Sequence, residues 1–330
     1  MRRRGFIALL GGAAAWPLTV RAQQPERMRQ IGVLMGYAES DPDAQARLAA
    51  FRDGLQKLGW AESRNIQIDT RWPIPADLES MERFAKELVA LQPDVILSHI
   101  TPTTAALLQQ TRTIPIVFAT VADPVGSGFV ASFSRPGGNA TGFTSIEPTI
   151  AGKWLSLLKE IAPRVARVAL LFNPVTAPYA EYFLNPLKAA ALSFGVEAIA
   201  APARDTSELE FIVAAQAREL NSGLIVTPDS FTHVHRAEIT SLAARHGLPA
   251  VYPFRQFSEV GGLLSYGNDE HDNFRRAALY VDRILRGARP SELPVEAPVK
   301  FELVINLKSA KALALDVPLR LQERADELIE

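Results

Sequence analysis

The sequence contains no cysteine among its 330 residues. This absence excludes disulfide bonds, zinc–thiolate sites, a thiol nucleophile and a lipid-modified cysteine anchor. The chain also lacks an excess of either charge, since 35 Lys and Arg stand against 36 Asp and Glu. Nucleic-acid binders depend on neutralising phosphates, so this balance argues against that class. We therefore expect no nucleic-acid partner and no disulfide-stabilised fold.

Motifs for catalysis and cofactor binding are missing as well. The chain has no GxxxxGK[ST], GxGxxG, GxSxG or HExxH pattern, and we expect the glycine-rich stretch Gly126–Gly142 to form turns. His233 and His235 are the one close histidine pair, but they stand at the start of an expected helix with no Cys or third His to complete a metal site. We expect no enzyme, no cofactor and no bound metal.

The first 22 residues have the pattern of an export signal. Three arginines at 2–4 precede an uncharged apolar run from Phe6 to Val20, and Ala22 offers a small residue for cleavage. The run is shorter than the roughly 20 residues that span a bilayer. The arginines also resemble a twin-arginine signal. We expect cleavage near Ala22 and a periplasmic protein whose net charge changes from −1 to −5 as four arginines leave; a retained N-terminal anchor is the alternative.

Apolar residues make up 48% of the whole chain, which supports a large core. Over the first half of the chain, short apolar runs alternate with segments whose apolar residues recur at helical spacing. Strands are expected at 30–36, 65–71, 94–98 and 114–119, with helices at 43–59, 77–91 and 103–112. Strands joined by helices in this order predict a parallel sheet covered on both faces.

The same pattern repeats in the second half. Strands are expected at 167–172, 196–201, 223–227, 248–252, 262–266 and 300–306, and helices at 179–194, 207–220, 234–246, 272–286 and 309–315. Residues 114–118 match residues 248–252, 134 residues further on. A repeat of this length is about one domain long, so it predicts two similar lobes.

We expect the chain to cross between the lobes near 144–150, 267–273 and 294–300. Lobe 1 would then comprise residues 23–146 plus 268–296, and lobe 2 residues 147–267 plus 297–330. Several crossings form a hinge, and such hinges commonly close around a ligand. The predicted fold is therefore α/β, with two Rossmann-like lobes of parallel strands joined by a multi-strand hinge.

In parallel α/β sheets, ligands bind beyond the carboxyl ends of the strands. In lobe 1 these ends carry Thr101, Thr103 and Thr104. Thr101 would cap a helix, and the free N–H groups at the start of that helix would suit a ligand carboxylate. An ordinary N-cap without a ligand is the alternative. Asp123 would accept an ammonium or hydroxyl group from a ligand, or would form an Asx turn before Pro124.

The corresponding ends of lobe 2 carry Asn173 and Asp229. Donors in one lobe and a carboxylate in the other would suit a zwitterion such as an amino acid. Tyr37, Phe254 and Tyr266 would form apolar walls, or would belong to ordinary packing.

Four segments resemble one known family. They are Asp123–Val130, Arg135–Gly142, Phe301–Lys308 and Arg324–Glu330. The chain from Ile31 to Glu330 is similar to the tryptophan/tyrosine-binding (TrpX-like) family of ABC-transporter substrate-binding proteins. The resemblance implies a type I periplasmic-binding fold without catalysis.

Position by position, the resemblance implies that Thr101 and Thr103 hold a carboxylate and that Asp123 and Asp229 face the cleft. Asp269 matches an Asp of the family's Y-G-x-D stretch. The sequence departs from the family pattern just beyond it, with Glu270 and His271 where aromatics are common and Phe274 where Gly is usual.

The sequence thus predicts a monomeric, exported solute receptor that closes on a small molecule, an amino acid or aromatic compound, and delivers it to an ABC permease in the inner membrane. A sensory ligand-binding protein for a membrane partner and a two-lobed α/β enzyme are the alternatives. The sequence does not name the ligand.

Overall fold

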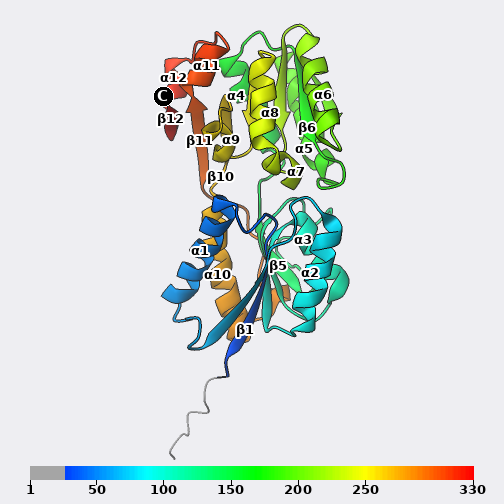
Figure 1. The fold of residues 1–330 in the computed structure, drawn as a ribbon, viewed down its shortest axis with the longest axis vertical. Coiled ribbons are helices and arrows are strands. Elements are labelled where there is room, and N and C mark those ends of the chain that lie inside the picture. The colour runs from blue at the N-terminus through cyan, green and yellow to red at the C-terminus, as the bar shows by residue number, and fades with distance from the viewer. Residues whose placement is uncertain (1–26) are drawn as a thin grey trace, which may run out of the picture.

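A computed structural model describes residues 27–330, and the predicted leader at 1–22 lies outside this part. The molecule is elongated, with two α/β lobes stacked along its long axis (Figure 1). No helix in residues 27–330 combines the length and the apolar character needed to cross a membrane.

Lobe 1, the lower one in Figure 1, contains a five-stranded parallel sheet in the order β2-β1-β3-β4-β5. Its elements are β1 (Arg29–Leu34), α1 (Pro42–Lys57), β2 (Ile66–Arg71), α2 (Leu78–Ala90), β3 (Val95–Ile100), α3 (Thr101–Gln110), β4 (Ile116–Val121) and β5 (Ala140–Thr144). The expected alternation of strands and helices is confirmed. However, β5 begins inside the stretch 126–142 that we expected to form only turns.

Helix α1 shows why the local sequence folds as it does. Asp41 is its N-cap and accepts hydrogen bonds from the N–H groups of Asp43 and Ala44, which satisfies two donors that a helix end leaves free. Apolar residues at helical spacing, such as Leu48, Phe51 and Leu55, are then buried on one face.

Lobe 2 contains a seven-stranded sheet in the order β12-β11-β10-β9-β8-β6-β7. Its elements are α4 (Ile150–Ile161), β6 (Arg167–Phe172), α5 (Ala180–Phe194), β7 (Glu197–Pro202), α6 (Thr206–Arg218), β8 (Ser222–Val226), α7 (Ser230–Val234), α8 (Arg236–Arg245), β9 (Ala250–Tyr252), α9 (Arg255–Glu259), β10 (Leu264–Asn268), β11 (Phe301–Asn306), α11 (Leu307–Ala312), α12 (Leu319–Gln322) and β12 (Glu327–Ile329).

One expectation for lobe 2 is wrong. Strand β11 runs antiparallel to β10, because β10 leads out of the lobe and β11 leads back in from the same end. The helix expected at 234–246 is present as α8, and a short helix that was not expected, α7, precedes it and ends just before His235.

The internal repeat is confirmed by topology. The strand order β2-β1-β3-β4 of lobe 1 corresponds to β7-β6-β8-β9 of lobe 2. Each lobe also has its own apolar core: Phe51, Phe118 and Phe274 belong to one cluster, and Trp154 and Phe257 to the other. We therefore propose the lobe boundaries given above, 23–146 plus 268–296 and 147–267 plus 297–330.

The last part of lobe 1 comes late in the chain. Helix α10 (Glu270–Leu285) follows β10 of lobe 2 but packs on α1 and β4, and the 3₁₀ turn η1 (Pro290–Glu292) follows it. The chain segments that link the lobes bond to one another. The N–H of Thr144 donates to the carbonyl of Glu296 (2.9 Å), and the N–H of Asp269 donates to that of Lys300 (3.0 Å).

Glycine is required at one point of these links. A Cβ atom at Gly267, in β10, would lie 1.7 Å from the carbonyl oxygen of Pro253. No side chain fits between Gly267 and this carbonyl, so only glycine is tolerated at this position beside the hinge.

Candidate ligand-binding site

The strand ends of the two lobes face each other across a small central cavity. Its volume is about 20 Å³, room for about one water molecule. Residues of both lobes line it: Tyr37, Ile100, Thr101, Pro102, Thr120, Ala122, Ser145, Tyr179, Pro228, Asp229, Ser230, Phe254 and Glu270. In this closed arrangement the centre of the cleft is almost filled by protein.

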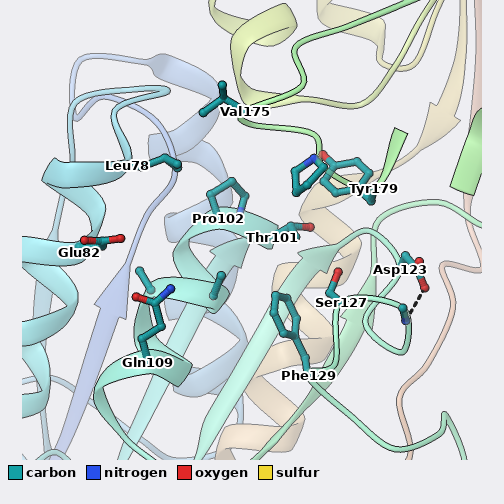
Figure 2. Close-up of a pocket in the computed structure, with 14 residues that line it drawn as sticks. Leu78, Glu82, Thr101, Pro102, Gln109, Asp123, Ser127, Phe129, Val175 and Tyr179 are labelled. Atoms are coloured by element: carbon teal, nitrogen blue, oxygen red, sulfur yellow. Dashed lines mark hydrogen bonds between the residues drawn. The ribbon is translucent and has the colours of Figure 1, made fainter. Parts of the chain in front are cut away.

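A larger pocket adjoins the central cavity and shares Thr101, Pro102 and Tyr179 with it. Its volume is about 360 Å³, within the range of small-molecule sites. Figure 2 shows α3 and the loop after β4 on one side, with Val175 and Tyr179 of lobe 2 on the other. Phe129 and Tyr179 contribute aromatic surface, and Glu82 and Asp123 contribute carboxylates. The two spaces together form a cleft with a polar centre and a mainly apolar side pocket.

The three threonines at the start of α3 have different positions. Thr101 lines both spaces, and its hydroxyl accepts a hydrogen bond from the N–H of Ala122 (3.0 Å). The hydroxyls of Thr103 and Thr104 both donate to the carbonyl of Ile100 (2.9 and 3.0 Å) and line neither space. Ile100 is the N-cap of α3, so the expectation that Thr101 caps the helix is wrong.

Asp123 lines the larger pocket and also shapes its own loop. Its Oδ1 accepts from the N–H of Gly126 (2.8 Å), and its φ of 42° is left-handed. Asp tolerates this conformation better than most residues. Asp123 thus holds its loop through a bond to the N–H three residues on, at the pocket edge, rather than through the expected Asx turn (Figure 2).

Asp229 lies beside the central cavity but is bonded within its own lobe. It caps α7, accepts from the N–H of Phe231 and the hydroxyl of Thr176 (3.2 and 2.5 Å), and accepts from the N–H of Asn173 (3.0 Å). Burial raises the pKa of Asp229 to about 6, although these donors oppose the shift. Asn173 itself lines neither space; its side chain bonds Val175, Thr176 and Arg204.

The aromatic candidates also differ in whether they line the central cavity. Tyr37 and Phe254 line the central cavity. Tyr266 does not; its ring stacks on Phe301 at 5.8 Å in the lobe 2 sheet. Asp269 belongs to the hinge, where it caps α10 and pairs with Lys300 (2.8 Å). The structure therefore brings Tyr37, Thr101, Asp229 and Phe254 together, with Asp123 in the adjoining pocket.

Several residues of the cleft were not among the sequence candidates. Ser145, Tyr179, Ser230 and Glu270 all line the central cavity. The hydroxyl oxygens of Ser145 and Ser230 are buried and have no hydrogen-bond partner in the part of the chain that the structure describes. Position directly after a strand end or a crossing is the signal that could have identified them, and Glu270 was noted only as a departure from a family pattern.

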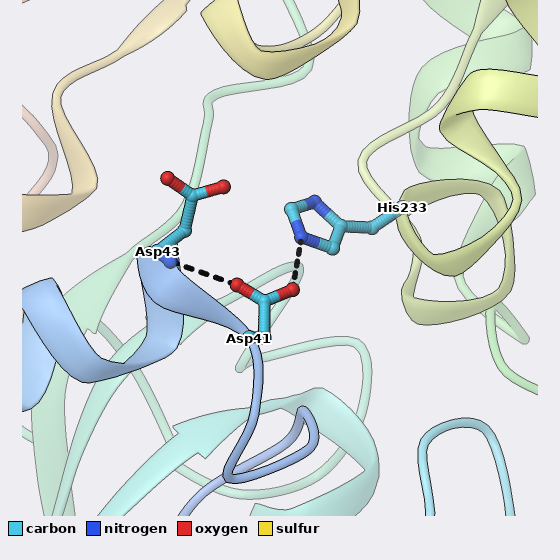
Figure 3. Close-up of side chains that lie close together, drawn as sticks. All are labelled: Asp41, Asp43 and His233. Atoms are coloured by element: carbon cyan, nitrogen blue, oxygen red, sulfur yellow. Dashed lines mark hydrogen bonds and ion pairs between the residues drawn. The ribbon is translucent and has the colours of Figure 1, made fainter. Parts of the chain in front are cut away.

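Contacts between the lobes surround Tyr37. Its ring stacks on the ring of His233 from lobe 2, with centroids 4.2 Å apart. His233 Nε2 lies 3.6 Å from Oδ2 of Asp41 (Figure 3). Arg236 lies 3.7 Å from the same carboxylate. Burial lowers the pKa of His233, and the nearby carboxylate of Asp41 opposes this shift. This group joins the lobes in the closed form.

The same group has the dimensions of a metal site. Asp41, Asp43 and His233 each place a ligand atom within 4.8 Å of the others. Arg236, however, lies 3.7 Å from Asp41 and 4.0 Å from Asp43, so a guanidinium cation already faces both carboxylates. His235 pairs instead with Glu238 (3.1 Å). We interpret the group as an ionic contact between lobes and assign no metal to it.

A family model described as ABC transporter substrate binding protein matches residues 37–329. The chain belongs to this family. Substrate-binding proteins of this kind bind small molecules and work with an ABC permease; they are solute-binding proteins rather than enzymes.

Individual relatives of this substrate-binding protein agree with the assignment. The tyrosine-binding protein of Clostridioides difficile (strain R20291) is 24% identical over 291 residues, covering 87% of this chain and 81% of the relative. A domain from Streptococcus pneumonia solved in complex with L-Trp is 25% identical with a TM-score of 0.82, covering 92% of this chain and 100% of that one. A conserved domain protein from Vibrio cholerae is 27% identical with a TM-score of 0.84 over the same shares. The TrpX-like resemblance and the two-lobed fold are thereby confirmed.

Proposed function

We propose that this substrate-binding protein is exported, binds an amino acid between its lobes and delivers it to the permease of an ABC importer in the inner membrane. Aromatic amino acids are the first candidates. The proposal is supported by family membership, by the arginine-led apolar segment at residues 2–20, and by relatives whose names or structures refer to tyrosine and L-Trp.

The observation that carries the ligand class is the composition of the central cavity. Asp229 and Glu270 provide carboxylates, while the buried hydroxyls of Ser145 and Ser230 provide donors without protein partners. A buried polar group without a partner is costly, so such groups are typical of places where a ligand completes the bonding. An α-amino acid carries both an acceptor for the hydroxyls and a cation for a carboxylate.

The adjoining pocket suits the side chain of such a ligand. It measures about 360 Å³ and is walled by Phe129, Tyr179 and Pro102. An aromatic ring there would bury apolar area against aromatic neighbours, a favourable contact of about 0.5–1.5 kcal/mol beyond burial itself.

Binding in this cleft requires the lobes to separate. The central cavity in the closed form holds about one water molecule, so an amino acid enters an open form and the lobes then close on it. Closure around a ligand gives a permease a conformation to recognise, which is how receptor and transporter would be coupled.

The test is calorimetric titration of the chain without residues 1–22 against the common amino acids, aromatic acids, nucleosides and sugars. We expect saturable binding of at least one amino acid, recovered chemically unchanged. Binding of sugars or nucleosides alone would contradict the amino-acid assignment, and conversion of the ligand would contradict a transport role. Uptake by cells with and without the gene distinguishes an importer from a sensory receptor, because only the former changes uptake.

A further inference from the structure

Two carboxylates face the central cavity, and they differ in what they already bond. Asp229 accepts three hydrogen bonds, from the N–H groups of Asn173 and Phe231 and the hydroxyl of Thr176. A carboxylate has about four acceptor positions. Asp229 therefore uses most of its capacity to hold the loops of lobe 2 together.

Glu270 is the opposite case. It is the first residue of α10, its side chain is 5% exposed, and it lines the central cavity. Within residues 27–330, its one ion-pair contact is Arg47 Nη2, 2.5 Å from Oε2, and that oxygen has no partner with hydrogen-bond geometry. Nearly all of its acceptor positions are therefore unused in a site where water is scarce.

Arg47 is the residue that holds this carboxylate in place. The guanidinium is wholly buried, lies 5.4 Å from the centre of the Tyr37 ring, and does not line the cavity. Its positive charge lies directly against the Glu270 carboxylate at the start of α10. Within residues 27–330, all three guanidinium nitrogens lack hydrogen-bond partners. A buried ion pair with so few hydrogen bonds gives little reason to assign the pair a stabilising role. This favours a role for the pair in ligand binding.

We propose that Glu270 determines ligand specificity by accepting hydrogen bonds from the ammonium group of the ligand, with Arg47 as the positioning residue that holds it toward the cavity. The site would thus select amines over the same molecules without the amino group. This inference rests on the proposed function, since it concerns the ligand of the same cleft.

The test compares ligand pairs that differ only in the amino group: L-tyrosine with 3-(4-hydroxyphenyl)propanoate, and L-tryptophan with indole-3-propanoate. In Glu270→Gln, affinity for the amino acid should fall at least tenfold and affinity for its partner less than twofold. The matched control Asp229→Asn should change both members of a pair by the same factor. An equal loss for both in Glu270→Gln, or no loss for the amino acid, would overturn the proposal.

Glu270→Gln leaves Arg47 without a counter-charge and could impair folding. The double variant Arg47→Met, Glu270→Gln removes both charges, and we expect it to fold and to show the same selective loss; a double variant that still prefers the amino acid would overturn the proposal. If the wild type binds no amino acid, the amino-acid ligand is wrong and the comparison becomes tyramine with 4-ethylphenol. Equal wild-type affinity for those two, or binding of neither, would refute the role of Glu270 itself.

Discussion

His233 of lobe 2 lies with its Nε2 atom 3.6 Å from Oδ2 of Asp41 in lobe 1, while its ring stacks on Tyr37. Among the ion pairs of residues 27–330, those that join the lobes away from the connecting segments all involve Asp41 or Asp43. We expect this contact to form as the lobes close, so that it adds to the free energy of closure and thereby to ligand affinity.

Asp41→Asn tests this contact with little damage to the fold. Asparagine caps helices about as well as aspartate, so α1 should keep its N-cap while the charge that faces His233 and Arg236 is lost. We expect affinity to fall about three- to tenfold, which corresponds to about 0.7–1.4 kcal/mol. Calorimetry measures the change. Asp77→Asn, at the N-cap of α2, is the control and should leave affinity unchanged.

Ligand affinity should fall as the pH falls through about 6.5. In the closed form burial lowers the pKa of His233, while Arg47 and Arg236 lower it and Asp41 and Glu270 raise it by smaller amounts. In the open form an exposed histidine has a pKa of about 6.5. Below about pH 6.5, closure of the lobes therefore releases a proton from His233. Ligand affinity then falls by at most about tenfold for each unit by which the pH is lowered.

Titrations at several pH values between 5.5 and 7.5 measure this slope, and His233→Gln should reduce it. A slope of the opposite sign, with tighter binding at low pH, would show that His233 is protonated in the closed form and would contradict this account.

Asp229 should give folding stability its own pH dependence. Its pKa is about 6 in the folded chain, against about 3.8 for the free group. The folded protein binds this proton more tightly than the unfolded chain does. The contribution of Asp229 to folding stability is therefore fully present below about pH 4 and is lost as the pH rises to about 6. At about 1.4 kcal/mol per unit, the loss is at most about 3 kcal/mol. Between about pH 4 and pH 6, the melting temperature of the wild type should therefore fall more steeply with rising pH than that of Asp229→Asn. Identical slopes would argue against a titrating Asp229.

Gly267→Ala should be strongly destabilising. The added Cβ atom would meet the Pro253 carbonyl oxygen at 1.7 Å, and backbone on both sides must move. We expect a loss of about 3 kcal/mol or more in the free energy of unfolding. Gly138→Ala is the matched control, because nothing lies within 4 Å of its Cβ position. Denaturant unfolding that found the two variants equally stable would refute the close approach.

Much of the fold could be predicted from the sequence because buried strands and amphipathic helices leave local patterns. The strand at Arg167–Phe172 has the predicted bounds, since a run of apolar residues is enclosed by loops. Helix α4 was missed, although Trp154, Leu155 and Leu158 are buried, because no element was expected between the crossing at 144–150 and the strand at 167–172. The turn-like composition of residues 126–142 likewise hid the start of β5, whose pairing with β4 is a tertiary contact.

The candidate site was harder to predict than the fold. Strand ends pointed to Thr101 and Asp229, and both line the central cavity, but sequence position does not show which side chains turn inward. Thr103 and Thr104 bond their own helix start, and Asp229 bonds its own lobe. The pair Arg47–Glu270 joins residues more than 200 positions apart, and no local pattern records such a contact.

The most direct test of the central claim is one calorimetric titration of the chain without residues 1–22, at neutral pH, with L-tyrosine and then L-tryptophan. The account predicts saturable binding of one ligand per chain for at least one of them, with the ligand recovered unchanged. Absence of binding by both, in a preparation shown to be folded, would contradict an aromatic amino-acid receptor.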